Sequence, residues 1–180
     1  RSERLREYLD AHLPGFKGPL QVEQFRGGQS CPTYLLTCPS GRYVLRRKPP
    51  GKLLPSAHAV DREFRVLSAL ADAGYTVARP ALLCEDDDVV GTMFYVMEFV
   101  EGRVFWDPVM PELDPEQRTE AYRALVDALA TLHEYDVAAI GLEDFGRPGN
   151  YFGRQIGRWS KQYVASETDS IAEMNRLMEW

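Results

Sequence analysis

The sequence is poor in the features that define several large classes of protein. Its three cysteines, Cys31, Cys38 and Cys84, are an odd number without a Cys-x-x-Cys spacing. This excludes a disulfide framework and a cysteine zinc site, and it indicates free thiols in a reducing, cytoplasmic compartment. No apolar run approaches the ~18 residues that a membrane-spanning helix needs, so we expect no membrane contact.

The chain also lacks an excess of positive charge. It carries 21 Lys and Arg against 27 Asp and Glu, a formal net charge of −6. Nucleic-acid binding needs clustered cations along a phosphate backbone, so a nucleic-acid partner is not expected. The basic residues do gather in one short segment, which points instead to a small phosphorylated ligand: Arg42, Arg46, Arg47, Lys48 and Lys52.

Start and stop signals are missing at the two ends. The chain begins Arg-Ser-Glu-Arg, without Met or the apolar core of a signal peptide. At the other end, the helical spacing of residues 171–178 meets no capping or breaking residue. With 180 residues, 44% of them hydrophobic and 27% charged, we expect a soluble globular fragment of a longer protein.

What is present is a strand-rich first half. Period-two patterns bounded by turn residues predict strands at residues 20–25, 33–38, 42–47, 81–84 and 93–100. Residues 2–13 and about 56–73 have helical spacing, the second stopped by Gly74, and residues 85–88 form an acidic turn. We therefore predict a five-stranded antiparallel sheet with one inserted helix.

The second half changes to helix. Asp114 followed by Pro115 is typical of a helix start, and an apolar stripe continues to His133. A glycine-rich loop at residues 141–153 precedes a helix from Tyr151 onward. We place the lobe boundary near Gly102, where the helical half begins. Residues 1–101 then form one lobe, and residues 102–180 form the beginning of a helical one.

A glycine pair, Gly27 and Gly28, lies at the turn between the first two predicted strands. Without a Cβ, backbone N–H groups can approach a polyanion closely. Such a pair is more often only a turn device, but here a basic strand follows. Alternation on that strand places Val44, Arg46 and Lys48 on one face. Arg46 is the first candidate for a phosphate cation and Lys48 the competing one; a solvated basic edge strand is the alternative.

The inserted helix carries a carboxylate on its apolar stripe. Glu63 lies three residues after Val60 and four before Leu67, so it should face the sheet. A buried carboxylate needs a cation, for which Arg46 is the natural partner. The alternative is a surface Glu63 that pairs locally with Arg62 or Arg65.

The segment Met-Glu-Phe-Val at residues 97–100 ends the last predicted strand and could form a hinge between lobes. The C=O of Glu98 and the N–H of Val100 would then meet the edge of an adenine ring. Backbone groups would read the base, so this pattern is weak by itself. The alternative is an ordinary strand leaving the sheet.

Four segments together resemble the aminoglycoside phosphotransferase/choline kinase-like family. They are Phe-Arg-Gly-Gly-Gln-Ser-Cys-Pro-Thr-Tyr, Tyr-Val-Leu-Arg-Arg-Lys-Pro-Pro-Gly, Asp-Arg-Glu-Phe-Arg-Val and Phe-Tyr-Val-Met-Glu-Phe-Val-Glu-Gly-Arg. More narrowly, they resemble the kinase-like domain fused to some acyl-CoA dehydrogenases. The resemblance implies an α+β, two-lobed protein-kinase-like fold that transfers the γ-phosphoryl group of ATP or GTP to a hydroxyl of a small molecule, such as a hydroxyacyl-CoA.

The resemblance also implies roles for individual residues. The residues that match the family's nucleotide-binding positions are Gly27, Gly28, Gln29 and Ser30 in the phosphate loop, Val44 over the adenine, Arg46 and Glu63 as the strand–helix pair, and Glu98 and Val100 in the hinge. The subgroup usually has Asn where this chain has Cys31, so no role is assigned to that residue.

The family's catalytic and metal motifs do not occur in this sequence. It contains neither a His-Gly-Asp nor an Asp-Trp pair, so we assign no catalytic and no metal-binding residue. We expect Mg²⁺ only together with a further C-terminal segment, and no phosphoryl transfer by these 180 residues alone. The alternative is a non-catalytic, pseudokinase-like nucleotide-binding module; the pattern gives no oligomeric state.

Overall fold

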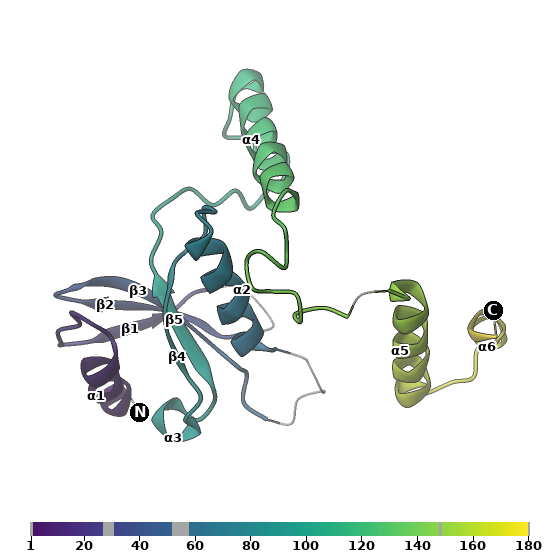
Figure 1. Cartoon of the computed structure of the whole chain (residues 1–180), viewed down its shortest axis with the longest axis horizontal. Helices are drawn as coiled ribbons and strands as arrows, with labels where there is room; N and C mark the ends of the chain where they lie inside the picture. Colours follow the sequence, from purple (N-terminus) through teal and green to yellow (C-terminus); the bar gives the residue numbers. More distant parts are fainter. Residues whose placement is uncertain (1, 27–30, 52–57, 148, 180) are drawn as a thin grey trace. The chain divides into compact units, whose positions relative to one another are not determined.

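The computed structural model of the chain describes residues 2–26, 31–51, 58–147 and 149–179 (Figure 1). The chain divides into two compact units, Arg1–Gly141 and Leu142–Trp180. We describe each unit by itself. The first contains the sheet and the predicted strand–helix pair.

The first unit is built on one five-stranded sheet, as predicted. All neighbouring strands are antiparallel, in the order β1-β2-β3-β5-β4. The last strand therefore inserts between β3 and β4 instead of adding to an edge. The strands are β1 (Gln21–Gln24), β2 (Thr33–Cys38), β3 (Gly41–Arg47), β4 (Pro80–Cys84) and β5 (Phe94–Glu98).

Alternation along the strands gives the sheet two apolar faces. The helices α1 (Ser2–His12) and α3 (Asp87–Val90) cover one face, and α2 (Val60–Asp72) covers the other (Figure 1). Leu9, Leu45 and Phe94 belong to the core on the α1 side. Val60 and Tyr95 belong to the smaller core under α2. A residue's position in the alternation thus decides which core it joins.

Helix α2 follows the predicted stripe but begins later than the expected residue 56. Val60 is fully buried, and Leu70 and Ala71 are buried near the helix end. Gly74 follows with φ +84°, a left-handed conformation that glycine adopts without strain and that ends the helix as predicted. The strand expected at residues 93–100 is also shorter, because β5 ends at Glu98.

The acidic segment predicted as a turn contains a short helix instead. The Asp86 carboxylate accepts a hydrogen bond from the Asp88 N–H at 2.8 Å, which caps the first turn of α3. Gly91 ends the helix with φ +97°. Val89 and Val90 are buried against the sheet, and this tertiary burial favours the helix.

Helix α4 (Pro115–His133) begins at the predicted signal, with a capping box between Asp114 and Gln117. Hydrogen bonds connect it and the segment after it to the region of α2. Tyr75 donates to the carbonyl of Ala128, and Tyr135 to the carbonyl of Ala73. The predicted apolar stripe is exposed at Tyr122, Leu125 and Leu129, and Leu132 is partly buried.

The second unit contains α5 (Tyr151–Ser166) and α6 (Ala172–Met178), in which no residue is buried. Across the described residues, no helix is both long and apolar enough to span a bilayer.

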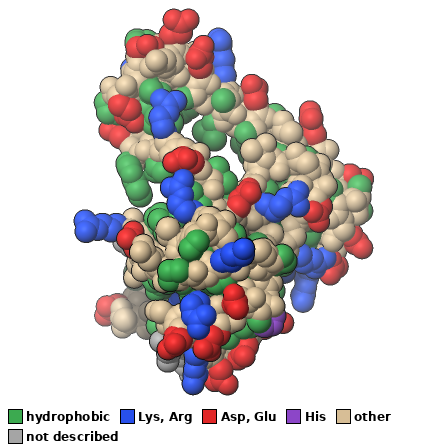
Figure 2. All heavy atoms as spheres, turned by 90° about the vertical axis from the view of Figure 1, so that its left-hand side faces the viewer, with side chains coloured by type: hydrophobic (Ala, Val, Ile, Leu, Met, Phe, Trp, Pro, Cys, Tyr) green, Lys and Arg blue, Asp and Glu red, His purple; other side chains and the backbone are tan. Residues whose placement is uncertain are grey.

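On the face of the first unit that carries α1, acidic and basic side chains are interspersed (Figure 2). The basic side chains do not form a continuous patch on the part of this face that Figure 2 shows.

Candidate functional site

Three polar side chains lie side by side in one row across the centre of the sheet. Arg46 on β3 is paired in register with Thr33 on β2 and with Tyr95 on β5. The Arg46 and Tyr95 side chains both meet Glu63 of α2, so the row faces that helix. Elsewhere the α2 side of the sheet is mainly apolar, and this row is therefore a polar site within a hydrophobic surface.

The strand cation and the helix carboxylate form a two-point ion pair. The Nε of Arg46 donates to Oε2 of Glu63 at 2.6 Å, and its Nη2 donates to Oε1 at 3.3 Å. Both side chains are about one-third exposed, at 31% and 35%. Such a fork fixes the orientation of the guanidinium as well as its position. The hydrogen bond to Glu63 is also the main reason why the pKa of Arg46 is raised.

Thr33 and Tyr95 support this pair from the two flanking strands. Arg46 Nη1 donates to the Thr33 hydroxyl at 3.3 Å, and that hydroxyl donates to the carbonyl of Cys31 at 3.1 Å. The Tyr95 hydroxyl donates to Oε2 of Glu63 at 3.2 Å. Burial, followed by the negative charge of Glu63, raises the pKa of Tyr95, so the phenol stays protonated at neutral pH.

The other predicted residues of β3 lie as alternation requires. Val44 is 9% exposed and is paired in register with Leu35 and Met97, two positions before Arg46. Lys48 lies beyond the end of the strand, with its Nζ 3.8 Å from Oδ1 of Asp61. The two candidate cations thus have different partners on α2.

The segment expected to form a hinge begins at the end of β5. The Glu98 N–H donates to the carbonyl of Arg79 at 2.9 Å, and the Glu98 carboxylate accepts from the Arg79 N–H at 2.9 Å. The guanidinium of Arg42 lies 4.4 Å from the ring centroid of Phe99. Val100 is 61% exposed, and its N–H has no hydrogen-bond partner within the described part of the chain.

The predicted phosphate loop, Gly27, Gly28, Gln29 and Ser30, lies outside the described residues. Cys31, which follows it, is buried, with its Sγ 3.5 Å from Nδ1 of His58. Burial is the main cause of a raised pKa at the Cys31 thiol; Arg46 opposes the shift and Glu63 adds to it. The sequence pattern did not identify this contact.

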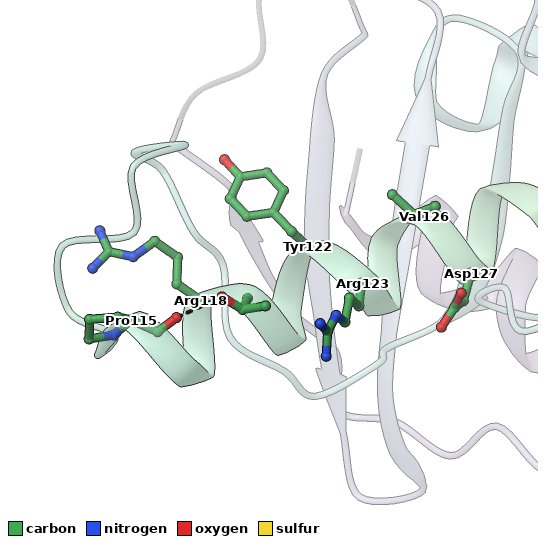
Figure 3. A pocket seen from close by; sticks show the side chains of 7 residues that line it. Pro115, Arg118, Tyr122, Arg123, Val126 and Asp127 are labelled. Atoms are coloured by element: carbon green, nitrogen blue, oxygen red, sulfur yellow. Dashed lines mark hydrogen bonds between the residues drawn. The ribbon is translucent and has the colours of Figure 1, made fainter.

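A pocket of about 540 Å³ lies elsewhere, along α4 (Figure 3). It is lined by side chains of that helix, including Arg118, Tyr122 and Val126, and contains none of the predicted site residues. The described residues also place no three His, Cys, Asp or Glu side chains together as metal ligands. We therefore take the polar row, not the pocket on α4, as the candidate site.

Sequence reasoning missed two members of this site, Thr33 and Tyr95. Alternation on β5 could have placed Tyr95 and Met97 on one face, because Phe94 and Val96 face the other core. No local pattern, however, shows that β5 lies beside β3.

Comparison with known proteins identifies relatives along almost the whole chain. A family model described as the phosphotransferase enzyme family matches residues 21–180. "Probable acyl-CoA dehydrogenase IBR3" of Arabidopsis thaliana is 54% identical over 177 residues, covering 93% of this chain and 22% of that protein. "Acyl-CoA dehydrogenase family member 11" of Rattus norvegicus is 47% identical over 180 residues, covering 98% of this chain and 23% of that protein. The chain thus spans less than a quarter of the length of these two relatives.

A solved structure from Ralstonia eutropha, described as a "putative aminoglycoside phosphotransferase", has the same fold. It superposes with a TM-score of 0.79 at 48% sequence identity, covering 100% of this chain and 52% of that one. The α+β fold predicted from the sequence, protein-kinase-like with a five-stranded antiparallel sheet, is confirmed.

Proposed function

The chain belongs to the phosphotransferase enzyme family, and from this premise we propose that it forms the nucleotide-binding part of a small-molecule kinase. The enzyme would transfer the γ-phosphoryl group of ATP or GTP to a hydroxyl group. In this proposal residues 1–101 form the nucleotide-binding lobe and residues 102–180 begin the helical lobe. The boundary falls inside the first compact unit, because hydrogen bonds from Tyr75 and Tyr135 join α4 and the segment after it to the region of α2.

The observation that carries the proposal is the ion pair between Arg46 and Glu63. A guanidinium has five N–H donors, and the described residues accept from three of those of Arg46. The others are available in a fixed orientation, which suits a phosphate oxygen. A cation on the third strand held by a carboxylate of the following helix is the arrangement that protein-kinase-like folds use on ATP phosphates.

Two further features support a nucleotide at this position. Val44 lies on the Arg46 face, where a small apolar side chain can pack on an adenine ring. The C=O of Glu98 at the end of the adjacent strand β5 and the N–H of Val100, an exposed residue just beyond it, could bind the ring's edge. The glycine turn predicted from the sequence at residues 27–30 would supply backbone N–H groups to the phosphates.

Phosphoryl transfer in this fold class uses Mg²⁺, which neutralises charge on the phosphates. The described residues do not form a metal site, so we assign no magnesium ligand to them and derive no step through the ion. We propose that Arg46, Val44 and the hinge bind and orient the nucleotide. The names of the relatives favour a hydroxylated acyl-CoA as the acceptor, because acyl-CoA dehydrogenases act on acyl-CoA thioesters.

Calorimetric titration of the full-length protein with ATP tests the nucleotide site. Arg46→Ala should lower ATP affinity by about tenfold or more, because it removes charge-assisted hydrogen bonds. Lys48→Ala is the matched control and should change affinity much less. The reverse order would identify Lys48 as the cation, and loss in neither variant would contradict the site.

Incubation of the full-length protein with Mg-ATP and hydroxyacyl-CoA tests the reaction. We expect phosphorylated acyl-CoA by mass spectrometry. Nucleotide binding that is independent of Mg²⁺, together with no product from any hydroxylated substrate, would favour a non-catalytic nucleotide-binding module instead.

A further inference from the structure

Oε2 of Glu63 accepts two hydrogen bonds from two different strands. One comes from Arg46 Nε at 2.6 Å and one from the Tyr95 hydroxyl at 3.2 Å. A phosphate that binds the remaining N–H donors of Arg46 would share the positive charge of the guanidinium with Glu63. The Tyr95 hydroxyl gives the carboxylate a second donor that does not depend on Arg46, so this donor would keep the carboxylate in position.

The Tyr95 side chain is itself firmly placed. It is 2% exposed, and its ring packs edge-on against Phe64 of α2, with centroids 6.2 Å apart. A buried aromatic side chain with so few free torsions is a rigid support. The hydroxyl is the polar end of this support, and Glu63 is its partner.

We propose that Tyr95 is a positioning residue for the nucleotide phosphates: its hydroxyl holds Glu63, and Glu63 orients the Arg46 guanidinium before nucleotide binds. This inference rests on the proposed function. Thr33 completes the support from the opposite side, because it accepts from Arg46 Nη1 and donates to the carbonyl of Cys31, the residue that follows the glycine turn. The row therefore links the phosphate cation to the end of the predicted phosphate loop.

A purely structural tyrosine would behave differently. If Tyr95 served only to fill the core, the Tyr95→Phe variant would bind nucleotide as well as the unchanged protein, because phenylalanine keeps the ring and its contact with Phe64. Under the positioning role, the hydroxyl matters only for ligands that reach Arg46. The two roles predict different results for ATP and for adenosine, which has no phosphate.

The test compares ATP and adenosine binding to the full-length protein and its Tyr95→Phe variant. We expect ATP affinity to fall by between about threefold and about tenfold, the effect of one hydrogen bond, and adenosine affinity to stay the same. Tyr43→Phe is the matched control, because Tyr43 lies on the same strand as Arg46 but packs on the α1 side of the sheet. It should change neither affinity.

A double-mutant cycle with Glu63→Gln tests the route of the effect. If Tyr95 acts through Glu63, adding Tyr95→Phe to the Glu63→Gln variant should produce little further loss of ATP affinity. Unchanged ATP affinity in Tyr95→Phe, or equal losses for ATP and adenosine, would overturn the inference. If Arg46→Ala still weakens ATP binding, the proposed function stands without it; a protein that binds no ATP would overturn both.

Discussion

At the scale of single residues, the site depends on orientation more than on stabilisation. Arg46 and Glu63 are each about one-third exposed, so solvent screens their attraction and the pair contributes less to stability than a buried one would. Its geometry is nevertheless well defined, because donors and acceptors from β2, β5 and α2 meet it at 2.6–3.3 Å. Because the guanidinium is already held in one orientation, little side-chain conformational entropy is lost when a phosphate binds to it.

The raised pKa of Tyr95 also predicts how the stability of the folded chain should depend on pH. Its pKa in the folded protein lies above the ordinary value of 10.0, chiefly because of burial and then because of Glu63. Above that ordinary value the unfolded chain loses the phenol proton while the folded chain keeps it, so stability should fall as pH rises from 10. The stabilisation that comes from the protonated Tyr95 phenol is fully present below pH 10.

Urea unfolding at pH 8 and at pH 11 measures this effect. Tyr95→Phe should lose less stability between the two pH values than the unchanged chain, by about 1 kcal/mol for one pH unit. Equal losses would show that Tyr95 titrates alike in both states. The buried Cys31 thiol, with its pKa also raised, should act in the same direction from its ordinary value of 9.0.

At the scale of secondary-structure elements, the two faces of the sheet have different roles. Helices α1 and α3 close the larger hydrophobic core on one face, in which Leu9 and Phe94 are fully buried. Helix α2 closes the other face and brings Glu63 to the polar row. The elements that stabilise the sheet are therefore largely separate from those that form the site.

Leu9→Ala should accordingly reduce stability without directly affecting nucleotide binding. Leu9 is 0% exposed, and removing it from a packed core costs about 2–5 kcal/mol. Leu129→Ala in α4 is the matched control in this 180-residue chain, because that side chain is 51% exposed and should cost much less. Thermal unfolding of both variants measures the difference. Similar losses would mean that α1 packs weakly on the sheet.

At the scale of the whole molecule, burial is uneven. The sheet and the helices on it contain most of the core, whereas no residue of α4, α5 or α6 is buried. Local opening requires least free energy where few apolar contacts are lost. The two ends of the 180-residue chain should therefore differ in local stability.

Hydrogen exchange of this chain should show the difference directly. Amides of β2, β3 and β5 should be protected the longest, whereas those of α5 and α6 should exchange orders of magnitude faster. Peptide-level mass spectrometry measures both in one sample. Equal protection in α5 and β3 would contradict the uneven distribution of burial.

The sequence by itself determined the elements and the facing of their side chains. Alternation on the third strand placed Val44 and Arg46 together, and the helical stripe turned Glu63 toward the sheet. These are local properties, since the periods of 2 and 3.6 residues are set by backbone geometry. The four-residue α3 was missed because it depends on a cap at Asp86 and on tertiary burial of two valines.

Only the tertiary structure decided which elements became neighbours. Strand β5 pairs with β3 only after the chain has passed through α2, β4 and α3, so that Arg47 lies opposite Phe94, a residue 47 positions later in the sequence.

 The cross-strand pairs that result, Arg46 with Tyr95 and Arg46 with Thr33, set the spacing of the polar row. Such pairing is fixed by the packing of both faces at once, because each strand must satisfy the α1 core and the α2 core together. For that physical reason the sequence could supply Arg46 and Glu63, whereas Thr33 and Tyr95 became part of the site only in the folded chain.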